Sequence, residues 1–138
     1  MAITAAVGAS ISCGVASGTR SLVPPHVVVT QVRASISRAK DPRPTSALFV
    51  LTRRQAANEV LSGASVNSNQ PVYVVVVKGS FTVVRPGPNA SGFMHVAVLN
   101  YVFDARTGRE TDGGFGRVLP DLTRLGRVHD LLPYLRHG

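Results

Sequence analysis

Few residues of this chain are of the types that perform covalent or metal chemistry. Its 138 residues include four histidines, seven carboxylates and one cysteine. No H-E-x-x-H or G-x-S-x-G motif occurs, and no glycine-rich loop of the phosphate-binding kind. His95 and Asp104 begin and end one predicted strand, so they lie roughly 30 Å apart and cannot act on one substrate together.

The other candidate groups are neighbours only in the sequence. His129 precedes Asp130, His137 lies near the C-terminus, and Glu110 and Asp112 flank a predicted turn. Such groups are more often solvated surface residues than metal ligands or acid–base catalysts. We therefore expect no enzymatic activity, no cofactor and no metal site.

The first 19 residues are small, weakly apolar and uncharged. They are similar to the apolar core of a secretory signal that lacks its basic start, as a start codon assigned too far downstream would produce. Cys13 follows Ser10-Ile11-Ser12, which resembles a bacterial lipobox, and would then be the lipidated residue. The alternative is that residues 1–24 form a disordered tail with an incidental cysteine. One cysteine excludes an intramolecular disulfide and a cysteine-based zinc site.

The chain is strongly basic, with a net charge of +8 and a pI near 11.1. Nucleic acid, an anionic membrane surface and an acidic envelope polymer are all compatible partners. Its 13 arginines and two lysines are scattered along the sequence, which favours a diffuse solvated surface over a polyanion site. Tyr73, Tyr101 and Phe103 lie inside apolar runs rather than between arginines, so nucleic-acid binding is the second interpretation. No segment reaches the ~18 apolar residues that span a membrane.

Two long apolar strands, residues 71–84 and 94–104, dominate the centre of the chain and are joined by a Pro/Gly-rich loop. Val72–Val77 has the composition of a central strand that is covered on both faces. In the second strand, alternation places Val96 and Val98 on the same face. A weak return strand follows over 109–115.

The turn between the last two strands has a specific composition. Asp104 and Thr107 are expected to accept hydrogen bonds from turn amides, and Gly108 to adopt a positive φ. These three residues are predicted to have a structural role.

Two helices are predicted before the long strands. An apolar stripe at spacings of three and four predicts the first over 26–40, from Val29, Val32, Ile36 and Ala39. A short strand over 46–51 comes next. Thr52 and Gln55 then have capping-box spacing, which predicts a second helix over 53–62.

These elements predict a single α+β domain over residues 25–138. It is an antiparallel three- to four-stranded meander with one or two helices packed on one face. The leucine-rich C-terminal segment is expected to form one or two short helical turns against the sheet. An exposed edge strand, 46–51 or 109–115, would allow pairing with another chain.

The run from Tyr101 to Glu110, with its D-A-R-T-G turn, resembles the closing strand of PepSY-type domains, a cystatin-like α+β family of secreted and membrane-attached bacterial proteins. The resemblance covers about residues 45–115. It implies a helix packed on a small antiparallel sheet and no enzymatic activity, and some such domains are thought to restrain proteases. Residues 70–74 are faintly similar to the cystatin Gln-x-Val-x-Gly loop.

The sequence therefore predicts a small non-enzymatic domain, exported or associated with the cell envelope, with a regulatory or scaffold role. Its partner would be an unidentified protein or an anionic envelope polymer. The alternative is a cytoplasmic basic protein that binds nucleic acid.

Overall fold

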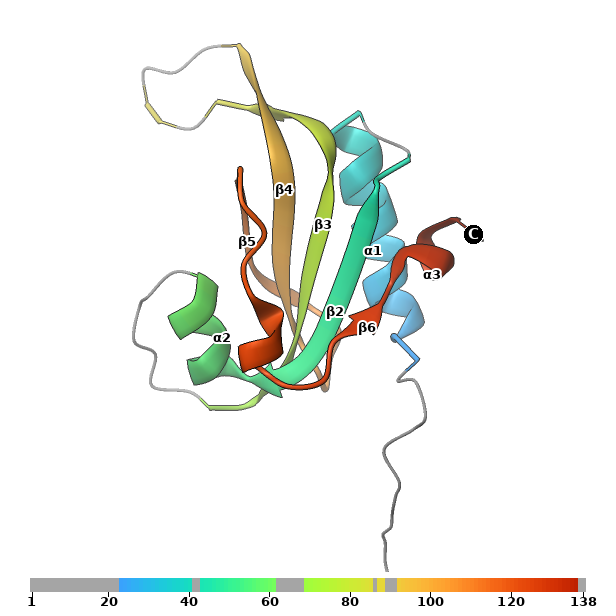
Figure 1. Cartoon of the computed structure of the whole chain (residues 1–138), viewed down its shortest axis with the longest axis vertical. Coiled ribbons are helices and arrows are strands. Elements are labelled where there is room, and N and C mark those ends of the chain that lie inside the picture. The colour runs from blue at the N-terminus through green and yellow to red at the C-terminus, as the bar shows by residue number, and fades with distance from the viewer. Residues whose placement is uncertain (1–22, 41–42, 62–68, 86, 89–91, 137–138) are drawn as a thin grey trace, which may run out of the picture.

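The computed structural model describes residues 23–40, 43–61, 69–85, 87–88 and 92–136. Five antiparallel strands form one sheet in the order β5-β4-β3-β2-β6 (Figure 1). Along the chain the elements are α1 (His26–Arg38), β2 (Ser46–Arg53), α2 (Arg54–Leu61), β3 (Pro71–Val84), β4 (Phe93–Asp104), β5 (Glu110–Gly116), the 3-10 turn η1 (Leu122–Arg124), β6 (His129–Asp130) and α3 (Leu132–Arg136).

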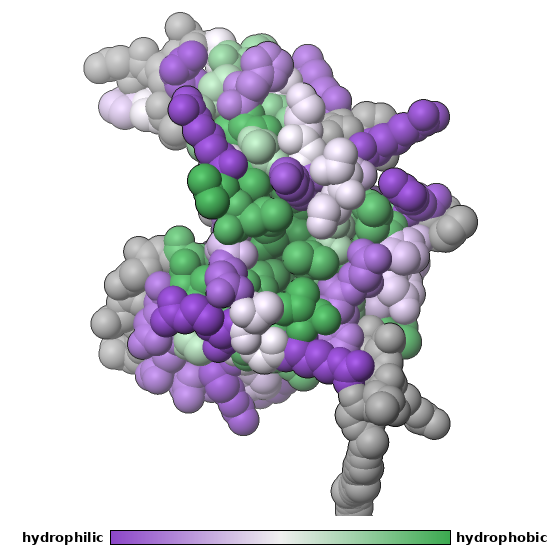
Figure 2. All heavy atoms as spheres, in the orientation of Figure 1, coloured by the Kyte–Doolittle hydropathy of each residue, from purple (hydrophilic) through white to green (hydrophobic). Residues whose placement is uncertain are grey.

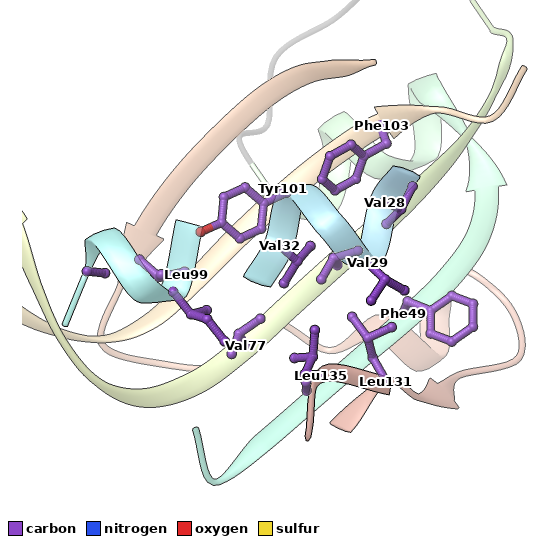
Figure 3. Close-up of a cluster of buried hydrophobic side chains, with 14 of the residues drawn as sticks. Val28, Val29, Val32, Phe49, Val77, Leu99, Tyr101, Phe103, Leu131 and Leu135 are labelled. Carbon is purple, nitrogen blue, oxygen red and sulfur yellow. The ribbon is translucent and has the colours of Figure 1, made fainter. Parts of the chain in front are cut away.

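Helix α1 packs across one face of the sheet and forms the larger apolar cluster with it. Val28 and Val32 of this helix are 1% and 0% exposed. Figure 3 shows them among side chains of the strands, including Phe49, with Leu131 and Leu135 completing the cluster from the C-terminal segment. Burying each such side chain stabilises the fold by about 1.5–3 kcal/mol, so this layer is a principal source of stability.

Helix α2 and the turn η1 cover the other face of the sheet. Ala57 and Leu122 are buried there against Val74 and Val102. Figure 2 views the molecule from this face, where apolar side chains gather at the centre with hydrophilic side chains above and below. Strand β3 is consequently covered on both faces, as its run of valines predicts.

The pairing of β3 with β4 is irregular at one place. The register shifts between Lys78 and Phe81, and beyond this bulge Phe81 pairs with Val96. Both of these residues join the α1-side cluster, whereas Val98 lies in the cluster beneath α2. The prediction that Val96 and Val98 share a face is therefore wrong, because the bulge bends and twists the paired strands.

The predicted fold class is confirmed: the chain is α+β, with an antiparallel meander and a helix packed on one face. The structure adds a fifth strand, because β6 pairs with Leu48 and Phe49 of β2. It also places a second helix, α2, on the opposite face. The C-terminal leucine-rich segment forms the short helical turns η1 and α3.

The second helix begins later than the capping-box pattern predicts. Thr52 lies in β2 opposite Val72, and pairing continues through Arg53 opposite Pro71. The helix starts only at Arg54, whose backbone N–H donates to the carbonyl of Gln70. Thr52 is therefore not the residue that immediately precedes the helix, because pairing with β3 extends the strand through Arg53. Among the described helices, none combines the length and apolar character needed to cross a bilayer.

Candidate functional site

The residues singled out for chemistry do not converge on one site. His95 and Asp104 lie at opposite ends of β4. His95 Nδ1 is 3.3 Å from Thr82 Oγ1, at the far end from the turn. In the described part of the chain, no three His, Cys, Asp or Glu side chains are grouped so that they could hold a metal ion. Cys13 and His137 lie outside the described residues.

The pair His129 and Asp130 has local contacts instead. The His129 ring lies against Phe49, with ring centroids 5.3 Å apart. Partial burial, and secondarily the charge of Arg127, lowers the pKa of His129. Asp130 Oδ1 accepts a hydrogen bond of 3.0 Å from the backbone N–H of Leu132, at the first residue of α3. These contacts join β6 to its neighbours.

The acidic residues on β5 have different partners. Glu110 is paired with Phe103 and Asp112 with Val102 in the ladder to β4. Asp112 Oδ2 forms an ion pair of 2.8 Å with the guanidinium of Arg54, which connects β5 to α2. This contact therefore fastens an edge strand to the helix beside it.

The turn after β4 is closed by its own side chains. Asp104 Oδ1 accepts hydrogen bonds from the backbone N–H groups of Arg106, at 2.7 Å, and Thr107, at 3.2 Å. These two bonds, the first being the stronger influence, hold the pKa of Asp104 below its usual range. Thr107 Oγ1 accepts a third bond, of 3.2 Å, from the N–H of Arg109.

Gly108 completes this turn and brings it against α1. Its φ is +75°, and its N–H donates to the carbonyl of Asp104 at 2.8 Å. A Cβ at this position would overlap Val27 Cγ1 of the helix. The carbonyl of Gly108 accepts a 2.8 Å bond from Gln31 Nε2. The turn thus fastens the first turns of α1 to the sheet.

An open site lies at the other end of α1, where the helix meets the β3–β4 hairpin. A cavity of about 320 Å³ lies between them. Its walls are mostly apolar and include Val83, Leu99 and Phe93, and Arg38 and Lys40 contribute its cations. A volume of this size is at the lower end of the range of small-molecule sites, roughly 300–1,000 Å³.

A short polar network forms one wall of this cavity. Arg38 Nη2 donates to Ser35 Oγ at 3.1 Å. Ser35 is also hydrogen-bonded to the Tyr101 hydroxyl, which in Figure 3 points toward the C-terminal turns of α1. Burial raises the pKa of Tyr101, and Glu110 acts in the same direction, so the phenol stays protonated at neutral pH. The cavity therefore offers hydroxyl and guanidinium groups beside apolar walls.

Lys40 has an unusual backbone at the edge of this cavity. Its φ is +63°, and its N–H donates to the carbonyl of Ser37 at 3.1 Å. Its Nζ lies 5.3 Å from the centroid of the Phe93 ring. The preceding carbonyl, that of Ala39, accepts a 2.9 Å bond from the N–H of Thr82, so the end of α1 is joined to β3. A left-handed lysine is strained, and such residues concentrate at functional positions.

Positive charge gathers around the same end of the molecule, which is at the top of Figure 1. We define the basic end by five exposed side chains, Arg38, Lys40, Arg43, Lys78 and Arg85. Backbone bonds hold it together: Thr45 N–H donates to Lys78 O, and Arg85 N–H donates to Gly92 O. Of the six carboxylates among the described residues, none lines the cavity.

Two large apolar side chains are exposed beside these cations. Val84 is 70% exposed and Phe93 60% exposed, and they face each other across the hairpin. Sequence analysis missed this site because its parts come from the end of a helix and from two strands far along the chain. The only local signal was a group of cations near the predicted helix C-terminus.

No protein-family model, curated protein or solved structure matches this chain. Function is therefore assigned from the geometry and charge of the described residues. The polar groups of the Asp104–Gly108 turn bond to one another and to α1. The basic end instead presents cations, exposed apolar side chains and a cavity, and it is the candidate functional site.

Proposed function

We propose that this protein is a small non-enzymatic domain of the cell envelope, acting outside the cytoplasm, whose basic end docks on an anionic lipid surface. One observation carries the proposal: exposed cations, among them Lys40 over the Phe93 ring and Arg85 next to Val84, accompany two exposed apolar side chains at one end of the fold. Each cation near an anionic membrane contributes about 1 kcal/mol of attraction. The apolar pair adds the hydrophobic contact that an interface accepts.

The apolar component distinguishes lipid from the other polyanions. A nucleic acid or an acidic polymer neutralises cations but offers no hydrocarbon layer to Val84. The ring of Phe93 lies beneath Lys40 Nζ, an arrangement that serves a headgroup region, where charge and hydrocarbon meet. A lipid surface uses both features of the basic end, so it is the favoured partner.

The proposed location rests on the sequence. The uncharged apolar residues 1–19 and the PepSY-like turn both support export, and lipidation of Cys13 would attach the protein to a membrane. A scaffold or regulatory role follows from the absence of a converging nucleophile and base among the candidate residues. Co-purification with the membrane fraction, lost in a Cys13→Ser variant, tests this part separately.

Vesicle co-sedimentation tests the docking surface. We expect the protein to bind phosphatidylglycerol vesicles, to bind phosphatidylcholine vesicles far less, and to be released by salt. The double variant Lys40→Gln/Arg85→Gln should weaken binding about tenfold or more. Its matched control, Arg106→Gln/Arg109→Gln, removes the same charge from the turn at the other end of α1 and should have a smaller effect.

Two results would overturn the proposal. Equal weakening by both double variants would mean that only total charge matters. Retention of labelled DNA or RNA on filters, with no vesicle binding, would favour the cytoplasmic nucleic-acid-binding interpretation. A Val84→Ser/Phe93→Ser variant tests the apolar component, because it should weaken vesicle binding while leaving every cation in place.

A further inference from the structure

The cavity at the basic end has the composition of a ligand site rather than of a packing defect. Its walls include the apolar side chains of Ala39, the C-cap residue of α1, Val83 of β3 and Leu99 of β4. The cations Arg38 and Lys40 also line it. Voids left by imperfect packing are usually small and closed, whereas ligand sites combine apolar walls with a few placed polar groups.

The charges at the cavity select the sign of a ligand. Neither Arg38 nor Lys40 forms a salt bridge with any carboxylate among the described residues. Arg38 donates to Ser35, and Ser35 is linked to the Tyr101 hydroxyl, so three donor side chains adjoin the apolar walls. An anionic head can receive charge-assisted hydrogen bonds there. A neutral or cationic head would leave the two cations without a counter-charge.

We propose that this cavity binds a single-chain anionic amphiphile, specifically a medium-chain fatty carboxylate, with its head at Arg38 and Tyr101 and its chain against Val83 and Leu99. The planar fork of Arg38 matches a carboxylate. The cavity volume of about 320 Å³ suits a chain of moderate length rather than a two-chain lipid. This inference goes beyond docking on a bilayer, because the ligand is taken one molecule at a time.

The unusual backbone of Lys40 fits this role. Its left-handed conformation ends α1 and places its ammonium over Phe93, beside the opening. A glycine at this position would relieve the backbone but would remove the cation. The retained strain therefore places a charge where the head of an amphiphile would enter.

Binding of decanoate in lipid-free solution, below its micelle concentration, tests the inference by calorimetry and by amide chemical shifts. We expect decanoate to bind at least tenfold more tightly than decanol, and decyltrimethylammonium not to bind. The largest shifts should fall on the amides of Thr82, Leu99 and Tyr101. Decanol binding as tightly as decanoate, or shifts confined to the α2 face, would overturn the inference.

Three variants test which side chains bind the head of the ligand. Arg38→Gln should weaken decanoate binding about tenfold, which corresponds to about 1.4 kcal/mol, and Tyr101→Phe should weaken it severalfold. Arg33→Gln on the same helix is the matched control, because Arg33 does not line this cavity, and it should leave affinity unchanged. An equal loss in Arg33→Gln and Arg38→Gln would contradict the assignment. Thermal unfolding of each variant verifies that it folds.

A cavity-filling variant separates this inference from the docking proposal. Val83→Trp should abolish decanoate binding while leaving phosphatidylglycerol vesicle binding intact, because it adds bulk and removes no cation. If the wild-type protein bound decanoate but not phosphatidylglycerol vesicles, the docking proposal alone would be overturned. Wild-type vesicle binding without decanoate binding would overturn the cavity proposal alone.

Discussion

The two ends of helix α1 meet the sheet in opposite ways. At the N-terminal end, the turn from Asp104 to Gly108 bonds its own amides, accepts Gln31 and fits against Val27. At the C-terminal end, the helix stops on a left-handed Lys40 and leaves a cavity beside exposed Val84 and Phe93. Both ends are linked to the sheet by backbone or side-chain bonds, but at the C-terminal end the exposed cations Arg38 and Lys40 also line a cavity.

This difference predicts that the turn contributes mainly to the stability of the fold and the basic end mainly to the proposed binding. Side chains at the turn satisfy one another, so changing them should affect folding more than binding. Side chains at the basic end contribute little to the two apolar clusters, so changing them should affect binding more than folding. Substitutions at the turn and at the basic end test the contrast.

The largest expected effect is at Gly108. Gly108→Ala should destabilise the fold by roughly 3 kcal/mol, because an alanine is strained at φ +75° and its Cβ would overlap Val27. Gly92 at the other end has φ +78°, and a Cβ placed there would meet no atom within 4 Å. Gly92→Ala should therefore lose only about 1 kcal/mol. Urea unfolding measures both, and equal losses would remove the contrast between the ends.

Asp104→Asn should lower the stability of the fold at neutral pH and make that stability less dependent on pH in the acid range. The backbone bonds from Arg106 and Thr107 lower the pKa of Asp104 in the folded state. Their contribution is therefore present above the unfolded-state pKa, about 3.9, and is lost as pH falls through the lowered folded-state value. Unfolding midpoints at pH 7 and pH 3 should differ less in the variant than in the wild type.

Asp121→Asn is the comparison for that experiment, because hydrogen bonds from Thr123 lower the pKa of Asp121 in the same way. The pKa of His129 is also lowered in the folded protein. Its protonation therefore also reduces the stability of the fold as the pH falls below about 6.5. A wild-type acid dependence that survives intact in Asp104→Asn would show that the turn carboxylate is not its source.

Lys40→Gly should raise stability by about 0.5–1 kcal/mol, since glycine adopts φ +63° without the penalty of a side chain. The same variant should bind phosphatidylglycerol vesicles more weakly. Lys40→Ala removes the cation but keeps the backbone penalty, so its stability should stay within about 0.5 kcal/mol of the wild type. If Lys40→Gly were less stable than the wild type, the left-handed conformation of Lys40 would not be the source of a backbone penalty.

The smallest effect is expected for the ion pair between α2 and β5. Arg54→Met should lose about 0.5 kcal/mol, because its partner Asp112 is half exposed and screened. The local effect should be larger: amides of β5 should exchange faster, since Arg54 also donates to Thr111 at 2.9 Å. A double-mutant cycle with Asp112→Asn measures the coupling, and unchanged exchange in β5 would contradict the local role.

Much of the fold was predictable because its signals are local. The valine run Val72–Val77 predicts a strand buried on both faces, and the apolar stripe of α1 predicts its buried side. Where local and long-range preferences compete, the prediction failed: Thr52 has capping-box spacing, but the ladder to Val72 holds it in the strand. The bulge between Lys78 and Phe81 has no strong local signature, and it changes which cluster receives Val96.

The candidate site was not predictable for a related reason. Arg38 and Lys40 have the pattern of cations that suit a helix C-terminus, and Val84 and Phe93 have the pattern of strand ends. Only the three-dimensional arrangement places Phe93 beneath Lys40 and brings both to the rim of one cavity. Chemistry shared by distant segments leaves no periodic pattern in a single sequence.

The order in which the apolar clusters close has a consequence for biosynthesis. Leu131 and Leu135 complete the layer that α1 begins, although the four longer strands of the sheet are translated between them. During synthesis, the apolar side of α1 is therefore incompletely covered until β6 and α3 leave the ribosome. A nascent polypeptide with this arrangement forms its long-range contacts late, so its folding is expected to be slow.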